Sequence, residues 1–554
     1  MSGAQERSKL VRRAGIVGAG TLASRLLGLG RDMALAAVFA RAETDAFFVA
    51  FTIPNALRQL LAEGAVSSAI VPVLSKTMAA EGAPAARQFF ARIRGASLLS
   101  LTVVTVLGMV AARPLTALFA DGYAGNVTEF ERTVHMTAVV FPYIFFMGTA
   151  ALGMAALNAE REFAVAAFAP GLLNVAFLLA AFLLPSMLEA HGIDRAMAMP
   201  IGALLGGVLQ VAAQWRSLRR LGYAARPVID LADRRVRDVG RRMLPMMFGI
   251  GVYYIDLILS RRFLSELGPG AQSYFSWSMR LCDFPQGIFV MALSTAALPT
   301  LATFAAKGEM RELAHTFAHG MSLALFVAIP ASVALALLGE PLVVMLFQRG
   351  KFDAIAASET ARALCWQGGA IWTVAAVRQT VPVFYALGDT RTPVLVSALD
   401  LLAFVALAVT LRGPLGHVGI SVAVAGSSFV QMTLLVLALK KKLGFVDGGR
   451  ILASGSRTAL ASGVAGIGAW GAGRLLAPLP LGGPFARLVP GAVTRGLFVT
   501  CAAPHQTEPP TGRSRPAAHL SRDDFPAPLG PTRPKTSPGV TSRVRLLTAI
   551  ALLG

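Results

Sequence analysis

The chain has 554 residues with a mean hydropathy of +0.62; 55% of its residues are hydrophobic and 15% are charged. Runs of about 20 apolar residues, the length that crosses a bilayer as a helix, recur along it, so an ordinary soluble domain and a transmembrane barrel with short alternating segments are both excluded. The formal charge of +21 does not indicate a nucleic-acid partner, because lysine and arginine gather in alternate connections between apolar runs.

The apolar runs predict an all-α polytopic membrane protein with about 13 membrane helices. In chain order we expect helices at 14–40, 45–75, 95–118, 133–158, 163–185, 196–215, 243–263, 272–306, 313–338, 357–387, 393–411, 418–439 and 452–478. The basic residues of 1–13 resemble the start of a signal peptide, but the continuation through Arg25 and Arg31 favours an uncleaved first helix.

The basic residues also predict the topology. Connections on the side of the N-terminus carry 25 lysines and arginines, and those on the opposite side carry 6. By the positive-inside rule the N-terminus lies in the cytoplasm, in a multi-pass protein of the bacterial inner membrane.

The longest basic connection, residues 216–242, separates six predicted helices from the next six. We therefore expect an N-terminal six-helix lobe at 1–220, a linker and C-terminal six-helix lobe at 221–442, and an additional C-terminal helix region at 443–500, with a central cavity between the lobes. The tail 501–554 is rich in proline and is expected to be disordered. A fourteenth helix begins near 485–500 and then ends, for which a translated frameshift is one hypothesis.

Charged residues inside the first two predicted helices are the strongest functional signal. They are Arg25, Arg31, Asp32, Asp45, Arg58 and Glu63. An ionisable side chain at membrane depth costs roughly 2.5–3.5 kcal/mol on insertion scales, so such residues normally line a cavity or a path. The alternative is that Arg31 only pairs with Asp32 or extends to the interface.

Arg25 and Arg31 are about 120° apart around an ideal helix, and Gly28 and Gly30 between them offer a place for bending or unwinding. In the second helix Asn55 and Arg58 are neighbours on one face after Pro54. In the eighth helix Arg280 and Asp283 repeat the spacing, and this pair could merely neutralise a buried charge.

The four arginines, Arg25, Arg31, Arg58 and Arg280, outnumber the carboxylates expected beside them. Guanidinium groups match phosphate in bidentate geometry, so the surplus predicts an anionic ligand with a phosphate or pyrophosphate. No clustered carboxylates and no pair of nucleophile and base are evident, which places a membrane transferase second to a transporter.

Other signals are weaker. Asp256 and Asp400, in the seventh and eleventh helices, could hold a cation or relay protons, or could be hydrated or paired with Arg261 or Arg262. The three cysteines have no metal spacing and are expected in helix packing. His315 and His319 lack a third ligand, and the glycine-rich runs at 15–20, 202–207 and 463–473 suit close helix packing. No metal site is predicted.

Several segments resemble the MurJ/MviN family of lipid II flippases, within the MOP exporter superfamily. They include SRLLGLGRD at 24–32, TDAFFVAFTIPNALRQLLAEGAVSSAIVP at 44–72, FPYI at 141–144, MRLCDFPQGIF at 279–289 and FYALGDTRTP at 384–393. The resemblance is collinear over about residues 10–480, and the first two motifs together are highly specific.

The resemblance implies a two-lobed flippase with a cationic cavity that alternates between cytoplasm and periplasm. The cavity arginines of the family fall on Arg25, Arg31, Arg58 and Arg280, and its motif acids and amides on Asp32, Asp45, Asn55 and Glu63. Asp283 stands where many members carry Glu, and is expected to keep the pair with Arg280. Coupling to Na⁺, protons or the membrane potential is implied, with Asp256 and Asp400 as the candidate cation site.

The function expected from the sequence is therefore translocation of lipid II, the lipid-linked peptidoglycan precursor, from the inner to the outer leaflet by a monomer without a cofactor. The alternatives are a flippase for another polyprenyl-linked glycan and an integral membrane glycan or phosphate transferase. The resemblance also implies a hydrophobic groove for the polyprenyl tail in the last two helices, of which this chain keeps the thirteenth and loses most of the fourteenth.

Overall fold

The computed structural model describes residues 3–58, 65–160 and 162–476, and all regular structure within these ranges is helical. Helices satisfy their backbone hydrogen bonds internally, which a bilayer requires. The helices are α1 Gly3–Val38, α2 Arg41–Arg58, α3 Ala65–Val110, α4 Ala112–Phe119, α5 Val127–Val140, α6 Tyr143–Ala159, α7 Phe163–Ala190, α8 Ala198–Arg220, α9 Arg234–Ser265, α10 Ala271–Pro285, α11 Met291–Lys307, α12 Met310–Leu337, α13 Gly339–Phe347, α14 Ala354–Gly369, α15 Ile371–Ala386, α16 Arg391–Leu415, α17 His417–Leu443 and α18 Gly448–Leu476. Short 3₁₀ turns cover Asp121–Gly125 and Arg195–Met197, and a π-helical turn covers Gln286–Val290.

Several helices that the sequence predicts as continuous are interrupted. The expected helix 133–158 is divided between α5 and α6 at Pro142, which has no N–H to donate. The expected helix 272–306 is α10 and α11 joined by the π-helical turn, and 357–387 is divided between α14 and α15 at Ala370. The helix α3 contains a sharp turn at Gly82, whose positive φ of 85° glycine adopts easily.

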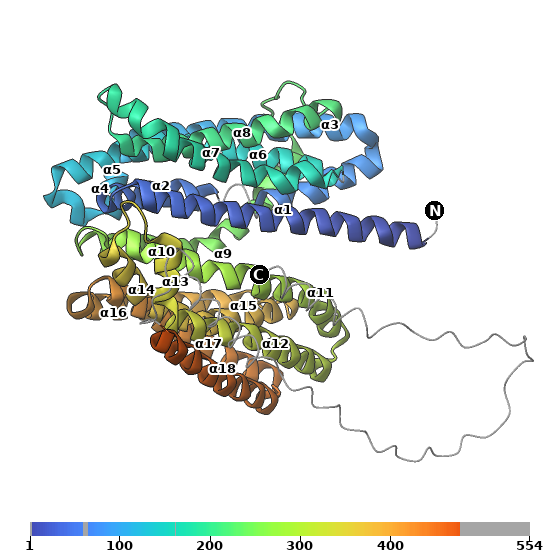
Figure 1. Cartoon of the computed structure of the whole chain (residues 1–554). Coiled ribbons are helices and arrows are strands. Elements are labelled where there is room, and N and C mark those ends of the chain that lie inside the picture. Colours follow the sequence, from blue (N-terminus) through green and yellow to red (C-terminus); the bar gives the residue numbers. More distant parts are fainter. Residues whose placement is uncertain (1–2, 59–64, 161, 477–554) are drawn as a thin grey trace, which may run out of the picture. The chain divides into compact units, whose positions relative to one another are not determined.

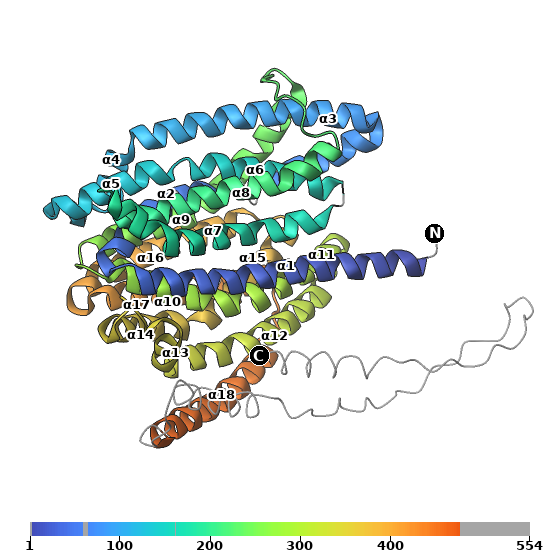
Figure 2. The same ribbon diagram turned by 45° about the horizontal axis from the view of Figure 1, so that its top comes forward.

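The helices before and after the linker pack mainly among themselves. In the first half α1 packs on α7, α7 on α8, and α3 on α6; in the second half α16 packs on α17 and α12 on α15 and α18 (Figures 1 and 2). The helix α9 contacts both halves, α3 and α4 on one side and α16 on the other. The domain boundaries expected from the sequence stay a prediction.

One hydrophobic core joins the two halves, and the others lie mostly within a half. The joining core contains Leu35 and Tyr143 from the first half with Trp277 and Leu364 from the second. These residues belong to α1, α6, α10 and α14. The two halves are therefore held together by apolar packing in one region of the molecule.

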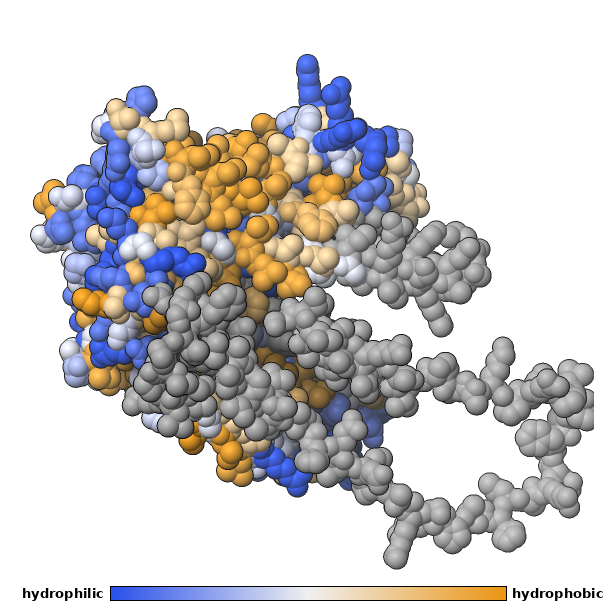
Figure 3. Space-filling model, in the orientation of Figure 1, coloured by the Kyte–Doolittle hydropathy of each residue, from blue (hydrophilic) through white to orange (hydrophobic). Residues whose placement is uncertain are grey.

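The surface is suited to a membrane. Among the described residues, seven helices are long and apolar enough to cross a bilayer. Hydrophobic residues cover the upper middle of the face in Figure 3, and hydrophilic residues gather at its left and its upper right. The protein is thus a multi-pass membrane protein, although the expected count of 13 membrane helices stays a prediction. The expected fourteenth helix and the tail lie outside the described residues.

Candidate functional site

The helix α1 directs its two arginines to different places. It continues as a helix through Gly28 and Gly30, so the expected unwinding there is wrong. Gly28 instead leaves room for Asn174 of α7, whose amide donates to the Ser24 carbonyl at 2.9 Å. Because the helix stays regular, Arg25 and Arg31 keep their separation around its axis.

The carboxylate of Asp32 lies between two guanidinium groups. Arg31 donates to Asp32 Oδ1 from Nε at 2.9 Å and from Nη2 at 2.7 Å. Nε of Arg280, from the other half, lies 3.7 Å from Asp32 Oδ2. The side chain of Asp32 is only 8% exposed and that of Arg280 is 40% exposed. The pairing of Arg31 with Asp32 therefore occurs, but as part of a bridge between halves.

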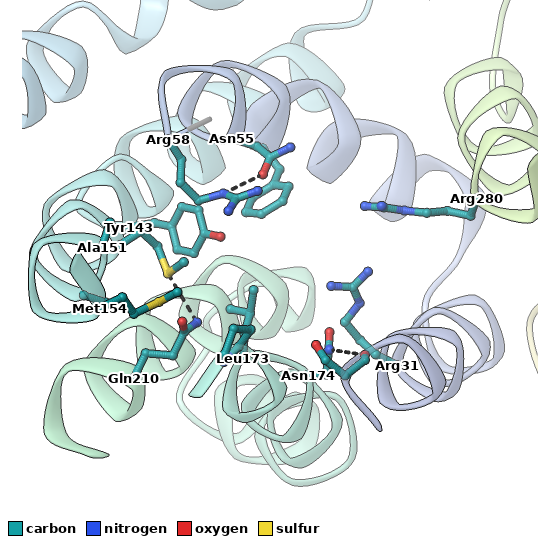
Figure 4. Close-up of a pocket in the computed structure, with 15 residues that line it drawn as sticks. Arg31, Asn55, Arg58, Tyr143, Ala151, Met154, Leu173, Asn174, Gln210 and Arg280 are labelled. Carbon is teal, nitrogen blue, oxygen red and sulfur yellow. Dashed lines mark hydrogen bonds between the residues drawn. The ribbon is translucent and has the colours of Figure 1, made fainter. Parts of the chain in front are cut away.

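A cavity of about 440 Å³ opens beside this bridge. It is lined by three of the predicted arginines, Arg31, Arg58 and Arg280, and by Asn55. Figure 4 shows Arg31 and Arg280 with their guanidinium groups toward each other, across the cavity from Arg58. Among its lining residues in the described ranges no carboxylate occurs. The remaining walls, including Tyr143 and Leu173 in Figure 4, are mostly apolar.

Asn55 positions Arg58 within this cavity. The two residues are one helical turn apart on α2, and Arg58 Nε donates to Asn55 Oδ1 at 3.1 Å. The helix α2 contains Pro54, and the structure describes it as far as Arg58. The next predicted site residue, Glu63, lies outside the described residues.

Arg25 and Asp283 lie beside a second cavity, in the C-terminal half. The Arg25 guanidinium packs directly over Gly287, where a Cβ atom would lie 2.3 Å from Nη1. Asp283 lines a cavity of about 350 Å³ together with Arg378 of α15. Arg280, Arg378 and Arg25 are the cationic groups that act electrostatically on its carboxylate.

The expected ion pair between Arg280 and Asp283 is wrong. No ion pair within 4.0 Å joins these two residues, both of which the structure describes, and Arg280 pairs with Asp32 instead. The reason is tertiary: α1 brings a carboxylate from the opposite half closer to Arg280 than its own helix does. Arg378 was missed by the sequence reasoning, although it is a charged residue in an apolar run and the same rule of burial cost would have found it.

Asp256 and Asp400 line the same second cavity. The two carboxylates interact electrostatically, and the Oδ1 atom of each is buried without a hydrogen-bond partner. Ser427, whose hydroxyl donates to the Val424 carbonyl at 3.3 Å, lines the cavity with Asp400. Neither Arg261 nor Arg262 pairs with Asp256: Arg261 donates to Gln272 and Ser276, and Arg262 pairs with Asp121.

Asp45 lies outside both cavities, at a junction between the halves. Its carboxylate is fully buried and accepts hydrogen bonds from the Gly270 N–H at 2.5 Å, and from the Ser273 N–H at 2.7 Å and hydroxyl at 2.5 Å. The neighbouring Thr44 hydroxyl lies 2.6 Å from the Ser273 hydroxyl. The carboxylate thus fixes the start of α10 to α2.

Further contacts between the halves lie at the same end of the molecule. Arg41 donates to the Tyr274 hydroxyl at 2.9 Å and pairs with Asp353 at 2.5 Å. The backbone N–H of Lys351 donates to the Ala37 carbonyl at 2.8 Å. This end carries the connections with few basic residues, and here the two halves are closed against each other.

The minor predictions have mixed outcomes. Cys282 is buried as expected and Cys365 is exposed, and Cys501 lies outside the described residues. His315 lies 3.5 Å from Asp447, and in the described part of the chain no cluster of three metal-ligating side chains occurs. The glycines at 202, 206 and 207 do pack closely, against α7 and α6.

Comparison with known proteins identifies relatives over most of the chain. A family model described as lipid II flippase MurJ matches residues 35–480. A probable lipid II flippase MurJ of Bdellovibrio bacteriovorus is 34% identical over 439 residues, which cover 79% of this chain and 83% of the relative. The lipid II flippase MurJ of Burkholderia cenocepacia is 34% identical over 430 residues, or 76% and 82% of the two chains.

Solved structures show the same fold. A lipid II flippase MurJ in an inward closed conformation superposes with a TM-score of 0.71 at 20% identity, covering 88% of this chain and 97% of that one. An inward-facing multidrug resistance transporter of the MATE family, in the MOP superfamily, gives a TM-score of 0.62 at 15% identity over 76% and 94% of the chains. At these identities the likeness concerns the fold alone.

Proposed function

The chain belongs to the MurJ family of lipid II flippases, and on this premise we propose that the cavity lined by Arg31, Arg58 and Arg280 receives the pyrophosphate of lipid II. The protein is a transporter and not an enzyme. It moves lipid II from the inner to the outer leaflet and so supports cell wall synthesis.

The observation that carries the site assignment is three guanidinium groups around one cavity without a lining carboxylate in the described residues. Guanidinium groups are costly to bury, and a pyrophosphate supplies the acceptors that several of them match. Asp32 holds Arg31 and Arg280 at a common point before the substrate arrives. The alternatives, another polyprenyl-linked glycan or a transferase reaction, have no observation in their favour.

The closed end indicates how transport proceeds. With the halves joined by Asp45, Arg41 and Tyr274, the cavity is shut at the end with few basic connections. Transport requires these contacts to break and the opposite end to close, so that the cavity faces each side in turn. The sugar-peptide head would occupy the cavity while the polyprenyl tail stays in lipid.

Complementation tests the assignment of the arginines. Arg31→Ala or Arg280→Ala should abolish growth of cells depleted of their own flippase, while Arg113→Ala, an exposed residue paired with Glu131, should not. All three variants should insert in the membrane at comparable levels. Normal growth with either cavity variant would show that the cavity does not bind the substrate in this way.

A reconstituted assay separates transport from chemistry. Purified protein in liposomes that contain lipid II should move it between leaflets, as measured by its accessibility to an enzyme outside the vesicle. The recovered lipid should be chemically unchanged. Conversion of a polyprenyl-phosphate substrate into a new product would instead support the transferase alternative.

We further propose that Asp256 and Asp400 hold the coupling cation, Na⁺ or a proton. The two carboxylates have orphaned buried oxygens, and the hydroxyls of Ser397 and Ser427 line the same cavity, which is the all-oxygen donor set that a hard cation prefers. A bound cation would neutralise two adjacent negative charges in a low-dielectric region.

Thermal unfolding in detergent tests this site without measuring transport. Added Na⁺ should raise the unfolding temperature of the parent protein relative to choline, and Asp256→Asn and Asp400→Asn should remove the increase. An increase that follows acid pH and not Na⁺ would assign a proton. If Na⁺ raised the unfolding temperature of both variants as much as that of the parent, the assignment of the cation site to Asp256 and Asp400 would be wrong.

Orientation and assembly complete the proposal. The excess of basic residues in the connections on the N-terminal side supports a cytoplasmic N-terminus in the bacterial inner membrane. We also propose that the protein functions as a monomer.

A further inference from the structure

The linker between the halves is fixed to the first half, at the end with the basic connections. The N–H of Val228 donates to the Ala91 carbonyl of α3 at 3.0 Å, and Arg94 Nη1 donates to the Ala225 carbonyl at 3.4 Å. Gly95 lets the linker lie directly on α3, because a Cβ atom there would be 2.2 Å from the Val228 carbonyl oxygen. The linker therefore has a defined position.

This fixed linker exposes large apolar side chains. Val228 is 47% exposed, Ile229 64% and Leu231 56%. Further along α3, Val103 and Leu107 are also exposed. An exposed apolar group at the end of a membrane helix is typical of insertion into the headgroup region of the bilayer.

A groove of about 440 Å³ lies beneath the linker, between α3, α6 and the start of α9. We call it the linker groove; its walls include Leu101, Leu152, Leu231, Val236, Gly240 and Met243. Its volume is in the range of small-molecule and lipid sites, and its walls are mainly apolar. Arg237 also lines it, together with the hydroxyl-bearing Ser97 and Ser100.

The first turns of α9 place a cationic stripe beside the groove. Arg234, Arg237 and Arg241 fall within about 60° of arc on the helix. In the part of the chain that the structure describes, none of the three forms an ion pair, and Arg237 donates only to the Ala232 carbonyl. Most of its five N–H groups thus remain available to a ligand.

Two of the nearby carboxylates, Asp230 and Asp233, are already paired. Arg92 pairs with Asp230 and Asp233, and Asp233 also accepts from the N–H groups of Arg235 and Val236 at the start of α9. Burial opposes ionisation of Asp233, but these hydrogen bonds outweigh it and lower its pKa. Because Asp230 and Asp233 are bound by Arg92, they do not neutralise Arg237.

We propose that the linker groove binds an anionic glycerophospholipid, with an acyl chain between α3 and α9 and its phosphate on Arg237. The groove supplies apolar walls, Arg237 supplies a phosphate partner at its rim, and Arg241 adds charge one turn further on. Basic pockets between membrane helices on the cytoplasmic side bind such headgroups. The site is separate from the proposed substrate cavity, and only the choice of leaflet rests on the proposed orientation.

Native mass spectrometry of the delipidated full-length protein tests the site. The probes are phosphatidylglycerol and phosphatidylcholine with identical acyl chains. The parent protein should bind phosphatidylglycerol more tightly, and Arg237→Gln should weaken this binding about tenfold, since one lost charge-assisted contact is worth about 1.4 kcal/mol. Arg234→Gln removes the same charge from outside the groove and should leave binding within about twofold.

A second variant tests the acyl-chain half of the site. A Cβ atom at Gly240 would meet no atom within 4 Å, so Gly240→Leu should fill the groove without disturbing α9, where leucine is a better helix former than glycine. It should also weaken phosphatidylglycerol binding about tenfold, with an unchanged unfolding temperature in lipid-free detergent.

Three results would overturn the proposal. They are equal binding of the two lipids by the parent protein, equal losses in Arg237→Gln and Arg234→Gln, and no loss in Gly240→Leu. A fourth result would also overturn it. If free glycerol phosphate competed as strongly as the lipid does, the groove would bind a free phosphate anion and not a phospholipid. Lipid II binding by the same Arg237→Gln sample should persist, which separates failure of this site from failure of the proposed function.

Discussion

At the scale of single residues, the shared carboxylate of Asp32 determines how the cavity arginines are presented. A buried carboxylate between two guanidinium groups lowers the cost of bringing both cations into one region. It also holds Arg31 through two N–H groups and leaves the rest of its planar fork directed at the cavity. The cavity is therefore organised for an anion before one binds.

Arg31→Lys should weaken lipid II binding about tenfold although the charge is kept. A lysine ammonium cannot bond Asp32 through two nitrogen atoms and also offer a planar fork to pyrophosphate, and a charge-assisted hydrogen bond is worth about 1.5–3 kcal/mol. Binding of lipid II to the purified variant measures the loss. Arg113→Lys, at an exposed pair with Glu131, should bind like the parent. Equal affinity of Arg31→Lys and the parent would mean that charge alone matters.

The connection between α15 and α16 contains a carboxylate outside the membrane whose ionisation is coupled to folding. Lys442 donates to Asp389 at 2.5 Å, and Thr392 donates to it from its N–H and hydroxyl. The hydrogen bond from Lys442, followed by those from Thr392, lowers the pKa of Asp389 below its ordinary value. This contribution to stability is complete above the unfolded pKa of about 3.9 and is lost as the pH falls through the lower folded pKa.

Asp389→Asn should therefore reduce stability at pH 7, and this reduction should shrink as the pH falls from 4 to 2. The expected difference is about 1 kcal/mol or less, because the pair is partly exposed and screened by solvent. Thermal unfolding in detergent across this pH range measures it. The matched control is Asp238→Asn, at an exposed carboxylate that forms no ion pair among the described residues. Its difference in stability from the parent should not change over this pH range. A constant difference at all pH values would contradict the coupling.

The sequence predicts which residues are charged at membrane depth but not which of them meet. Burial cost alone selects Arg25, Arg31, Arg58 and Arg280, and all but Arg25 line one cavity. The pairing of Arg280 with Asp32 instead of Asp283 depends on how α1 packs across the halves, which no spacing within a helix contains. The orphaned oxygens of Asp256 and Asp400 are likewise visible only after α9 and α16 are packed together.

At the scale of elements, the start of α10 depends on another helix. Its N-cap position is Gly270, in the left-handed region with a φ of 95°, and no side chain of its own caps it. Asp45 of α2 supplies the missing acceptors and places a negative charge at the positive end of the helix dipole. This cap exists only while the halves are closed at this end.

Asp45→Ala should shift the protein toward the state in which this end is open. The substitution leaves the first N–H groups of α10 without acceptors, at a cost of about 0.5–2 kcal/mol for a lost cap. Spin labels at the exposed positions Val127 and Ile355, one in each half, should report a larger population of long distances. The exposed Cys365 must first be replaced.

Two controls make the cap test specific. Asp45→Asn keeps one oxygen acceptor and should shift the distances less than Asp45→Ala. Glu189→Ala removes an exposed carboxylate of α7 that pairs with Arg195, within the first half, and should leave the distribution unchanged. Identical distance distributions in Asp45→Ala and the parent would show that the cap does not hold this end closed.

Helix interruptions divide into those that the sequence can predict and those that it cannot. Pro142 and Pro285 end or interrupt helices for a local reason, because proline has no backbone N–H to donate. A prediction from hydropathy alone does not take this missing donor into account. The π-helical turn after Pro285 and the packing of the Arg25 guanidinium over Gly287 are tertiary features. The composition gives the helical class, and the packing of the two halves gives the site.

At the scale of the whole molecule, two independent features distinguish the ends. The basic residues gather in the connections on the side of the N-terminus, and the contacts that close the halves lie at the opposite end. On the proposed orientation, the positive-inside rule places the closed end at the periplasm. A state that receives lipid II from the inner leaflet is closed at this end.

Cysteine accessibility in intact cells should report this orientation. In a background without reactive native cysteines, Arg226→Cys in the linker should be protected from a membrane-impermeant maleimide and become reactive after permeabilisation. Val127→Cys and Ile193→Cys, both exposed and at the opposite end, should react in intact cells. The reverse pattern would invert the topology and place the proposed phospholipid site in the outer leaflet. Labelling of all three positions in intact cells would show that the inner membrane was breached. A cytoplasmic marker protein with an exposed cysteine must therefore stay unlabelled in the same sample.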